Sequence, residues 1–183
     1  ESLNNHSKIR VLSIPNGWNL SQKLNYGIEE SNGKYIARMD SDDISYPNRI
    51  SKQVQYMERN PRIDVLGTGI KFIGHLNGNE DLNEKIALLP SDNKDLLLRM
   101  INKNPFFHPT VMIRLSSLEK HRLRYRKKFD RSQDYDLWVR CAGKLNFANL
   151  QEPLLDYRLH SFQSGVLGAA DSNYFSDLAK LNY

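Results

Sequence analysis

The chain has 183 residues, of which 39% are hydrophobic and 26% charged, enough for a folded core, so whole-chain disorder is excluded. No stretch reaches the roughly 18 apolar residues of a membrane-spanning helix. The single cysteine, Cys141, excludes a disulfide-stapled scaffold and favours a reducing compartment. The net charge of +5 favours an anionic partner, such as a nucleotide, a phospholipid, a phosphorylated glycan or a nucleic acid.

The first half of the chain alternates strand patterns with helix patterns. The expected elements are a strand over 9–14, a helix over 20–28, a strand over 35–39 and a helix from 47 to about 59. Asn19, with Gln22 three residues later, predicts a capping box at the start of the first helix. Ile50, Val54 and Met57 predict the inner face of the second helix. This alternation predicts βαβ units and a parallel sheet.

The second half continues the pattern with weaker signals. The expected elements are a strand over 65–73, a loop over 76–92, a helix near 96–101, a strand over 111–113, a helix over 135–142, strands over 145–147 and 154–157, and a helix in the last dozen residues. Gly67 and Gly69 predict a bend or a close backbone approach. Leu137, Trp138 and Cys141 are expected to point inward from their helix.

Three carboxylates follow the strand over 35–39 directly. Asp40, Asp42 and Asp43 lie within four residues, and like charges this close require a cation or exposure to water. Ligands of open α/β sheets bind beyond the carboxyl ends of strands, where a carboxylate pair can hold Mg²⁺ or Mn²⁺ together with phosphate oxygens. Two alternatives stay open from the residues alone. One is an acidic turn leading into the next helix, and the other is a phosphoryl-transfer enzyme with Asp40 as its nucleophile.

Other candidate site residues lie in the second half. Asp134 stands at the mouth of a helix, where it is either a cap or first-turn acid or a general base. His160 follows an expected strand and is either structural or a metal ligand. His108, beside Pro109, is either a loop residue or part of the same cleft. Five basic residues over 122–128 are either a solvated face or a contact for an anionic acceptor or membrane surface.

The order of these motifs resembles family 2 glycosyltransferases, over roughly residues 9–165. The matching stretches are LSQKLNYGI at 20–28, GKYIARMDSDD at 33–43, PNRI at 47–50 with Gln53, HPTVMIR at 108–114, QDYDLW at 133–138 and YRLH at 157–160. The resemblance implies an α/β fold of the GT-A type, a Rossmann-like sheet flanked by helices. We therefore expect one GT-A domain over residues 1–183, incomplete at its N-terminus.

The resemblance also implies how the donor is held. Asp40, Asp42 and Asp43 would bind a nucleotide-sugar, with a UDP-sugar favoured. Asp42 and His160 would coordinate Mn²⁺ or Mg²⁺, which stabilises the departing nucleoside diphosphate as a Lewis acid.

The same resemblance implies an inverting transfer to an acceptor hydroxyl. Asp134 would be the catalytic base, and His108, Trp138 and Arg158 would line the cleft or contact the acceptor. The implied acceptor is a glycan or a lipid-linked sugar of surface polysaccharide synthesis, and no nucleic acid is expected. We expect a cytoplasmic location, with peripheral contact at the inner face of the cell membrane as a further option. A non-catalytic basic module that binds glycans or membranes is the remaining alternative.

Overall fold

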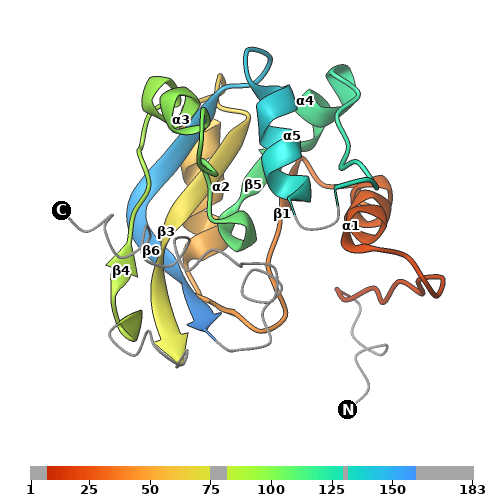
Figure 1. The fold of residues 1–183 in the computed structure, drawn as a ribbon, viewed down its shortest axis with the longest axis horizontal. Coiled ribbons are helices and arrows are strands. Elements are labelled where there is room, and N and C mark those ends of the chain that lie inside the picture. The colour runs from red at the N-terminus through yellow and green to blue at the C-terminus, as the bar shows by residue number, and fades with distance from the viewer. Residues whose placement is uncertain (1–7, 75–81, 130–131, 160–183) are drawn as a thin grey trace.

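A computed structural model describes residues 8–74, 82–129 and 132–159 of the chain. The helices are α1 (Leu20–Glu29), α2 (Arg49–Arg59), α3 (Asn93–Arg99), the 3₁₀ helix η3 (His108–Thr110), α4 (Leu115–Lys120) and α5 (Gln133–Cys141). The strands are β1 (Tyr35–Ala37), β2 (Ile44–Ser45), β3 (Val65–Gly74), β4 (Ile86–Ala87), β5 (Met112–Arg114) and β6 (Phe147–Leu159). The strands form one mixed sheet with helices on both of its faces (Figure 1).

The sheet is mostly antiparallel in its pairing, so the expectation of a parallel sheet needs correction. The strand order is β1-β5-β3-β6-β2, with β4 paired to β3, and only the β3–β6 pair is parallel. Because β5 is antiparallel to both β1 and β3, those two strands run in the same direction. The β1–α2–β3 unit therefore links two strands of like direction, as the sequence pattern predicts, but β5 is inserted between them. The hydrophobic pattern of a segment predicts that it forms a strand, but it does not show which other strand pairs with it.

Two layers of apolar side chains hold the helices to the sheet. On one face, Met57 of α2 packs with Leu66 and Met112 of the sheet. On the other face, Leu137 and Trp138 of α5 belong to a larger cluster that also draws on α1, α3 and α4. Trp138, Leu137 and Cys141 are fully buried, which confirms the predicted inner face of this helix. In Figure 1, α2 lies behind β3 and β6, and α5 lies in front.

The helix α1 begins as predicted and is held in place by its asparagines. The Asn19 side chain accepts a hydrogen bond from the backbone of Gln22, and the Gln22 side chain accepts one in return, which confirms the capping box. One turn later, Asn25 exchanges two hydrogen bonds with the backbone of Tyr125, at 2.8 and 2.9 Å. These bonds fix α1 against the segment that leads to α5.

The long strand β6 replaces the two short strands expected over 145–147 and 154–157. Polar residues at 151–152 and Pro153 interrupt the apolar pattern, but a register shift opposite Gly69 keeps the pairing with β3 intact. A Cβ atom on Gly67 would lie 2.1 Å from Asn149 Oδ1, and one on Gly69 would lie 2.3 Å from Leu88 Cδ2. The predicted close backbone approach at both glycines is therefore confirmed.

Three other expectations were wrong in detail. Residues 9–14 form no strand, because no described strand pairs with them, and Val11 is 58% exposed. Ile50 is 45% exposed, since α2 turns Arg49, Gln53 and Met57 inward instead. The loop expected over 76–92 contains the short strand β4. The terminal helix expected in the last dozen residues lies outside the described residues.

Candidate active site

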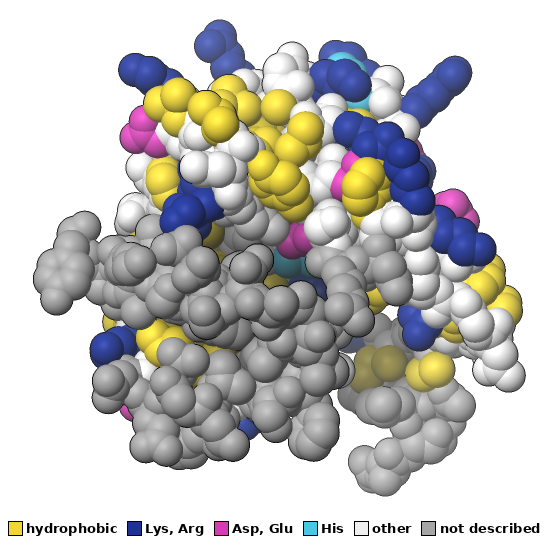
Figure 2. Space-filling view, viewed as in Figure 1, with side chains coloured by type: hydrophobic (Ala, Val, Ile, Leu, Met, Phe, Trp, Pro, Cys, Tyr) yellow, Lys and Arg dark blue, Asp and Glu magenta, His cyan; other side chains and the backbone are white. Residues whose placement is uncertain are grey.

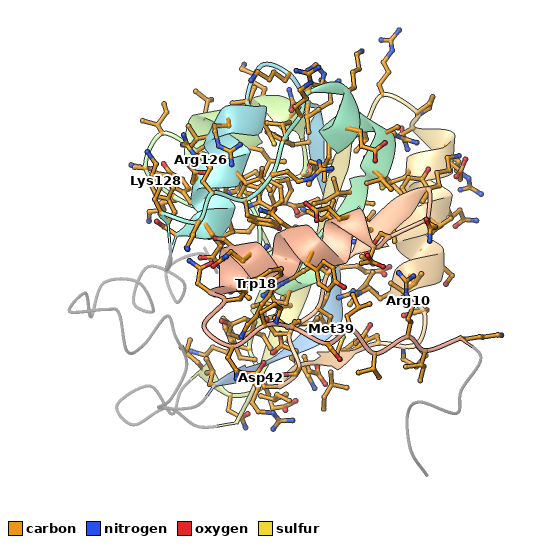
Figure 3. The ribbon with its side chains drawn as sticks, turned by 90° about the vertical axis from the view of Figure 1, so that its right-hand side faces the viewer. Arg10, Trp18, Met39, Asp42, Arg126 and Lys128 are labelled. Atoms are coloured by element: carbon orange, nitrogen blue, oxygen red, sulfur yellow. The ribbon has the colours of Figure 1, made fainter. Side chains whose placement is uncertain are left out.

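The three aspartates within residues 40–43 lie where the chain leaves the carboxyl end of β1. Asp40, Asp42 and Asp43 each offer a carboxylate oxygen, and these atoms lie within 4.8 Å of one another. Strand β1 has the direction of β3 and β6, although its described neighbour is the antiparallel β5, so the aspartates follow the carboxyl end of a strand as expected. Figure 3 shows Asp42 below Trp18, which lies just before α1, with Met39 nearby.

Arg38 binds the first aspartate of the cluster. Its Nη1 donates to Asp40 Oδ2 at 2.7 Å, and its Nη2 binds Oδ1, so the pair is bidentate. Burial raises the pKa of Asp40, and the guanidinium opposes that rise. The charges of Asp42 and Asp134 add to the rise in the pKa of Asp40. Arg38 is a site residue that was not predicted from the sequence, although a basic residue at the end of an apolar strand was an available signal.

Asp43 is the buried member of the cluster and is tied to β6. Its Oδ1 accepts a hydrogen bond from the backbone N–H of Arg158 at 2.9 Å, and burial raises its pKa to about 6. Its Oδ2 is buried without a hydrogen-bond partner among the described residues. An orphaned buried carboxylate oxygen beside two further carboxylates fits a divalent cation, because such cations take oxygen ligands.

Arg158 is also brought to the acidic cluster, from the far end of the chain. Its Nε donates to the carbonyl oxygen of Asp42 at 2.7 Å, in addition to its backbone bond to Asp43. The short strand β2, which follows the aspartates, pairs with β6 through Ile44 and Asp156. The predicted metal ligand His160 lies outside the described residues, two positions after Arg158 in the sequence.

Asp134 occupies the first turn of α5 and is not its cap. The N-cap is Ser132, which makes no side-chain capping bond. Asn104 Nδ2 donates to Asp134 Oδ2 at 2.5 Å. Burial raises the pKa of Asp134, while backbone N–H groups, Asn104 and Arg38 lower it. A half-buried carboxyl group with a raised pKa has the properties of a general base.

A buried aromatic layer lies beneath these charges, so two expectations are corrected. Trp138 and His108 were expected to line the cleft, but Trp138 is fully buried and His108 is 9% exposed. His108 Nε2 lies 2.9 Å from the hydroxyl of Tyr125, and the Trp138 ring meets Phe106 edge-on at 5.1 Å between centroids. Trp138 lies one turn after Asp134 in α5, on the inner face of the helix, so its side chain packs in the core.

The buried polar face of α2 supports the site from behind. Arg49 is 2% exposed and donates to the carbonyl oxygens of Pro109 at 2.8 Å and Arg38 at 2.9 Å. Gln53 is fully buried and donates to the carbonyl oxygens of Leu66 at 3.1 Å and Thr110 at 2.8 Å. These bonds fix the backbone that carries Arg38 into the acidic cluster. The sequence motif contained both residues, but their roles were not predicted.

The basic segment over 122–128 is partly engaged in structure. Arg126 pairs with the buried Asp136 of α5, and the Arg140 side chain binds the same carboxylate at 2.8 Å. The Arg126 and Lys128 cations lie 4.9 and 5.1 Å from the ring centroid of Phe129. Figure 3 shows both cations beside α5. A solvated face is therefore too simple a description of this segment.

The neighbouring surface of α3 and α5 is hydrophobic. Leu98, Ile101 and Val139 are 56%, 78% and 48% exposed. The Tyr135 hydroxyl donates to the carbonyl oxygen of Met100 at 2.6 Å, which joins the end of α3 to α5. Figure 2 shows a hydrophobic strip over these helices with Lys and Arg side chains around it. Within the described residues, no helix has the length and apolar character to cross a membrane.

Comparisons with known proteins agree with this geometry. The model of glycosyl transferase family 2 matches residues 1–122. An uncharacterized glycosyltransferase of Methanocaldococcus jannaschii is 38% identical over 156 residues, covering 82% of this chain and 51% of the relative. The O-antigen biosynthesis glycosyltransferase WbnJ of Escherichia coli is 39% identical over 163 residues, covering 87% of this chain and 59% of the relative. The chain thus spans about half the length of these relatives.

Solved structures show a similar fold. The Staphylococcus aureus TarS structure in complex with UDP-GlcNAc superposes with a TM-score of 0.61 at 13% sequence identity. The match covers 83% of this chain and 42% of TarS. The expected GT-A fold is therefore confirmed. With the family model matching most of the chain and two relatives above 30% identity, this chain belongs to glycosyl transferase family 2.

Proposed function

We propose that this chain carries the donor site and the base of a metal-dependent, inverting glycosyltransferase of surface polysaccharide synthesis. One observation supports this proposal above the others: the carboxylate oxygens of Asp40, Asp42 and Asp43 lie within 4.8 Å of one another at the end of β1, and Oδ2 of Asp43 is buried without a hydrogen-bond partner among the described residues. Family membership and the O-antigen relative support glycosyl transfer in polysaccharide synthesis.

The proposed metal site uses the acidic cluster. Asp42 and the orphaned Oδ2 of Asp43 would hold Mn²⁺ or Mg²⁺, with His160 as a further proposed ligand and Asp40 beside the nucleotide-sugar. A divalent metal would supply charge stabilisation to the departing nucleoside diphosphate. A UDP-sugar is favoured, because the TarS structure holds UDP-GlcNAc and an Escherichia coli relative, 26% identical, is a UDP-Gal-dependent galactosyltransferase.

Asp134 is the proposed base. Its carboxylate would take the proton from the acceptor hydroxyl as that oxygen attacks the anomeric carbon opposite the nucleotide. A single displacement of this kind inverts the anomeric configuration and needs one base. The raised pKa that burial gives Asp134 suits this role, because a stronger base takes a proton more readily.

A lipid-linked acceptor is supported by the surface over α3 and α5. Leu98, Ile101 and Val139 are exposed, and Figure 2 shows hydrophobic side chains over these helices with Lys and Arg side chains around them. Apolar and basic groups together suit a lipid-linked sugar at an anionic membrane surface. The related galactosyltransferase is named for an acceptor of this class, a GlcNAc-diphosphoundecaprenol.

The two other functions considered for the sequence have less support. An aspartyl nucleophile at Asp40 would need a free carboxylate oxygen, but both oxygens engage Arg38. A purely binding module would not need a half-buried carboxyl group with a raised pKa in addition to the acidic cluster.

The proposal is tested by calorimetry with Mn²⁺ and a panel of UDP- and GDP-sugars. We expect nucleotide binding that requires Mn²⁺, and we expect Asp42→Ala to abolish it, because the metal would lose a carboxylate ligand. Glu119→Ala, which removes an exposed carboxylate of α4, is the matched control and should bind as the original chain does. Equal Mn²⁺-dependent binding by Asp42→Ala would refute the metal site.

A further inference from the structure

Asn104 connects the proposed base to the loop between α3 and η3. Its Nδ2 donates to Asp134 Oδ2 at 2.5 Å, and its Oδ1 accepts a hydrogen bond from the backbone N–H of Phe106 at 3.2 Å. Its own carbonyl oxygen accepts from Arg99 Nε at 2.8 Å. The bond from Phe106 can be made only by the amide oxygen, so the NH₂ end of the side chain is the end that faces Asp134.

We infer that Asn104 is a positioning residue for glycosyl transfer, holding the Asp134 carboxylate in one orientation toward the acceptor hydroxyl. The inference rests on the proposed function, because it gives Asn104 a task only if Asp134 takes the acceptor's proton. Asn104 itself touches neither donor nor metal in this assignment. Its contribution passes through the one hydrogen bond to Asp134.

The amide group of Asn104 has a specific task as a hydrogen-bond donor, because the other surroundings of Asp134 have opposing effects on its ionisation. Burial disfavours the carboxylate form, whereas backbone N–H groups and the charge of Arg38 favour it. The hydroxyl of Tyr125, in the layer beneath, also senses the charge of Asp134. The amide of Asn104 donates to the ionised carboxylate and lowers its pKa without adding charge. Asn104 therefore opposes the rise in pKa that burial causes at Asp134 and favours the ionised form, which accepts a proton.

Two substitutions separate this task from the support of the loop. Asn104→Asp is nearly isosteric and keeps an oxygen for the Phe106 N–H, but it replaces the donor to Asp134 with a second carboxyl group. Asn104→Ala removes both bonds. Asn93→Ala is the matched control, because the Asn93 side chain likewise accepts a backbone N–H, that of Phe147, at 2.9 Å and is assigned no role at Asp134.

The experiment measures sugar transfer from the UDP-sugar that binds best to a GlcNAc-diphosphoundecaprenol analogue, from pH 5 to 9. For Asn104→Asp we expect kcat to fall about tenfold or more, and the acidic limb of the pH profile to move up by about one pH unit or more. The KM for the donor should stay within about twofold. Asn104→Ala should move the limb in the same direction by a smaller amount, and Asn93→Ala should leave it in place.

A second measurement does not depend on the acceptor. The Asp134 carboxyl carbon is titrated by ¹³C NMR, with its signal assigned by its loss in Asp134→Asn. A higher midpoint in Asn104→Asp supports the inference. An unchanged midpoint together with an unchanged acidic limb overturns it, even if stability falls. A different result would refute the proposed base itself: near-normal turnover by Asp134→Asn.

Discussion

The buried glutamine of α2 provides a quantitative test of how the site is supported. Gln53 is fully buried, and its Nε2 donates to the carbonyl oxygens of Leu66 in β3 and Thr110 in η3. Its Oε1 is buried without a described partner. Replacing it by leucine, Gln53→Leu, keeps the side-chain volume but leaves the two buried carbonyls without this donor.

The expected cost follows from these contacts. A buried polar group that loses its hydrogen-bond partner costs about 1–3 kcal/mol. Two unpaired carbonyls would therefore lower the free energy of unfolding by about 2–6 kcal/mol. Removing the orphaned Oε1 and burying an apolar group instead returns about 1–3 kcal/mol. We therefore expect Gln53→Leu to lower the free energy of unfolding by about 2 kcal/mol. For a chain of this length the corresponding fall in Tm is about 4–8 °C.

Urea denaturation followed by circular dichroism measures this change. The matched control is Gln55→Leu, because Gln55 lies on the same helix but is exposed. The control should stay within about 0.5 kcal/mol of the original chain, as surface substitutions usually do. Equal stabilities for Gln53→Leu and Gln55→Leu would show that the polar face of α2 does not hold the strand ends together.

Two further predictions concern the base and the buried histidine. Asp134→Asn should lower turnover by about 10²-fold or more while Mn²⁺-dependent nucleotide binding persists, as loss of a general base does; near-normal turnover in a transfer assay would contradict the assignment. Burial lowers the pKa of His108 well below 6.5, so the folded state binds fewer protons than the unfolded state below that pH. The stability that neutral His108 contributes is therefore present above pH 6.5 and is lost as the pH falls below it, by up to about 1.4 kcal/mol per pH unit. Urea melts of the original chain and His108→Gln at pH 7.5 and 5.5 measure this, and a stability difference between the two proteins that does not change with pH would contradict it.

Local features of this protein were predictable from the sequence because they depend on neighbouring residues. The capping box at Asn19 needs only a partner three residues away, and α5 turns Trp138 inward because its apolar residues recur at helical spacing. The acidic cluster after β1 was also visible, since its members lie within four residues. The resemblance in motif order then gave the family, which the comparisons confirm.

The arrangement of the candidate site was decided by tertiary structure, because its contacts join residues far apart in the chain. Asn104 meets Asp134 across 30 positions, and the Arg158 backbone reaches Asp43 across 115. No periodicity in the sequence records such a pairing. The fold likewise determines that β5 separates β1 from β3 and that Arg49 is buried, because a polar side chain enters the interior only where backbone carbonyls of other elements converge on it.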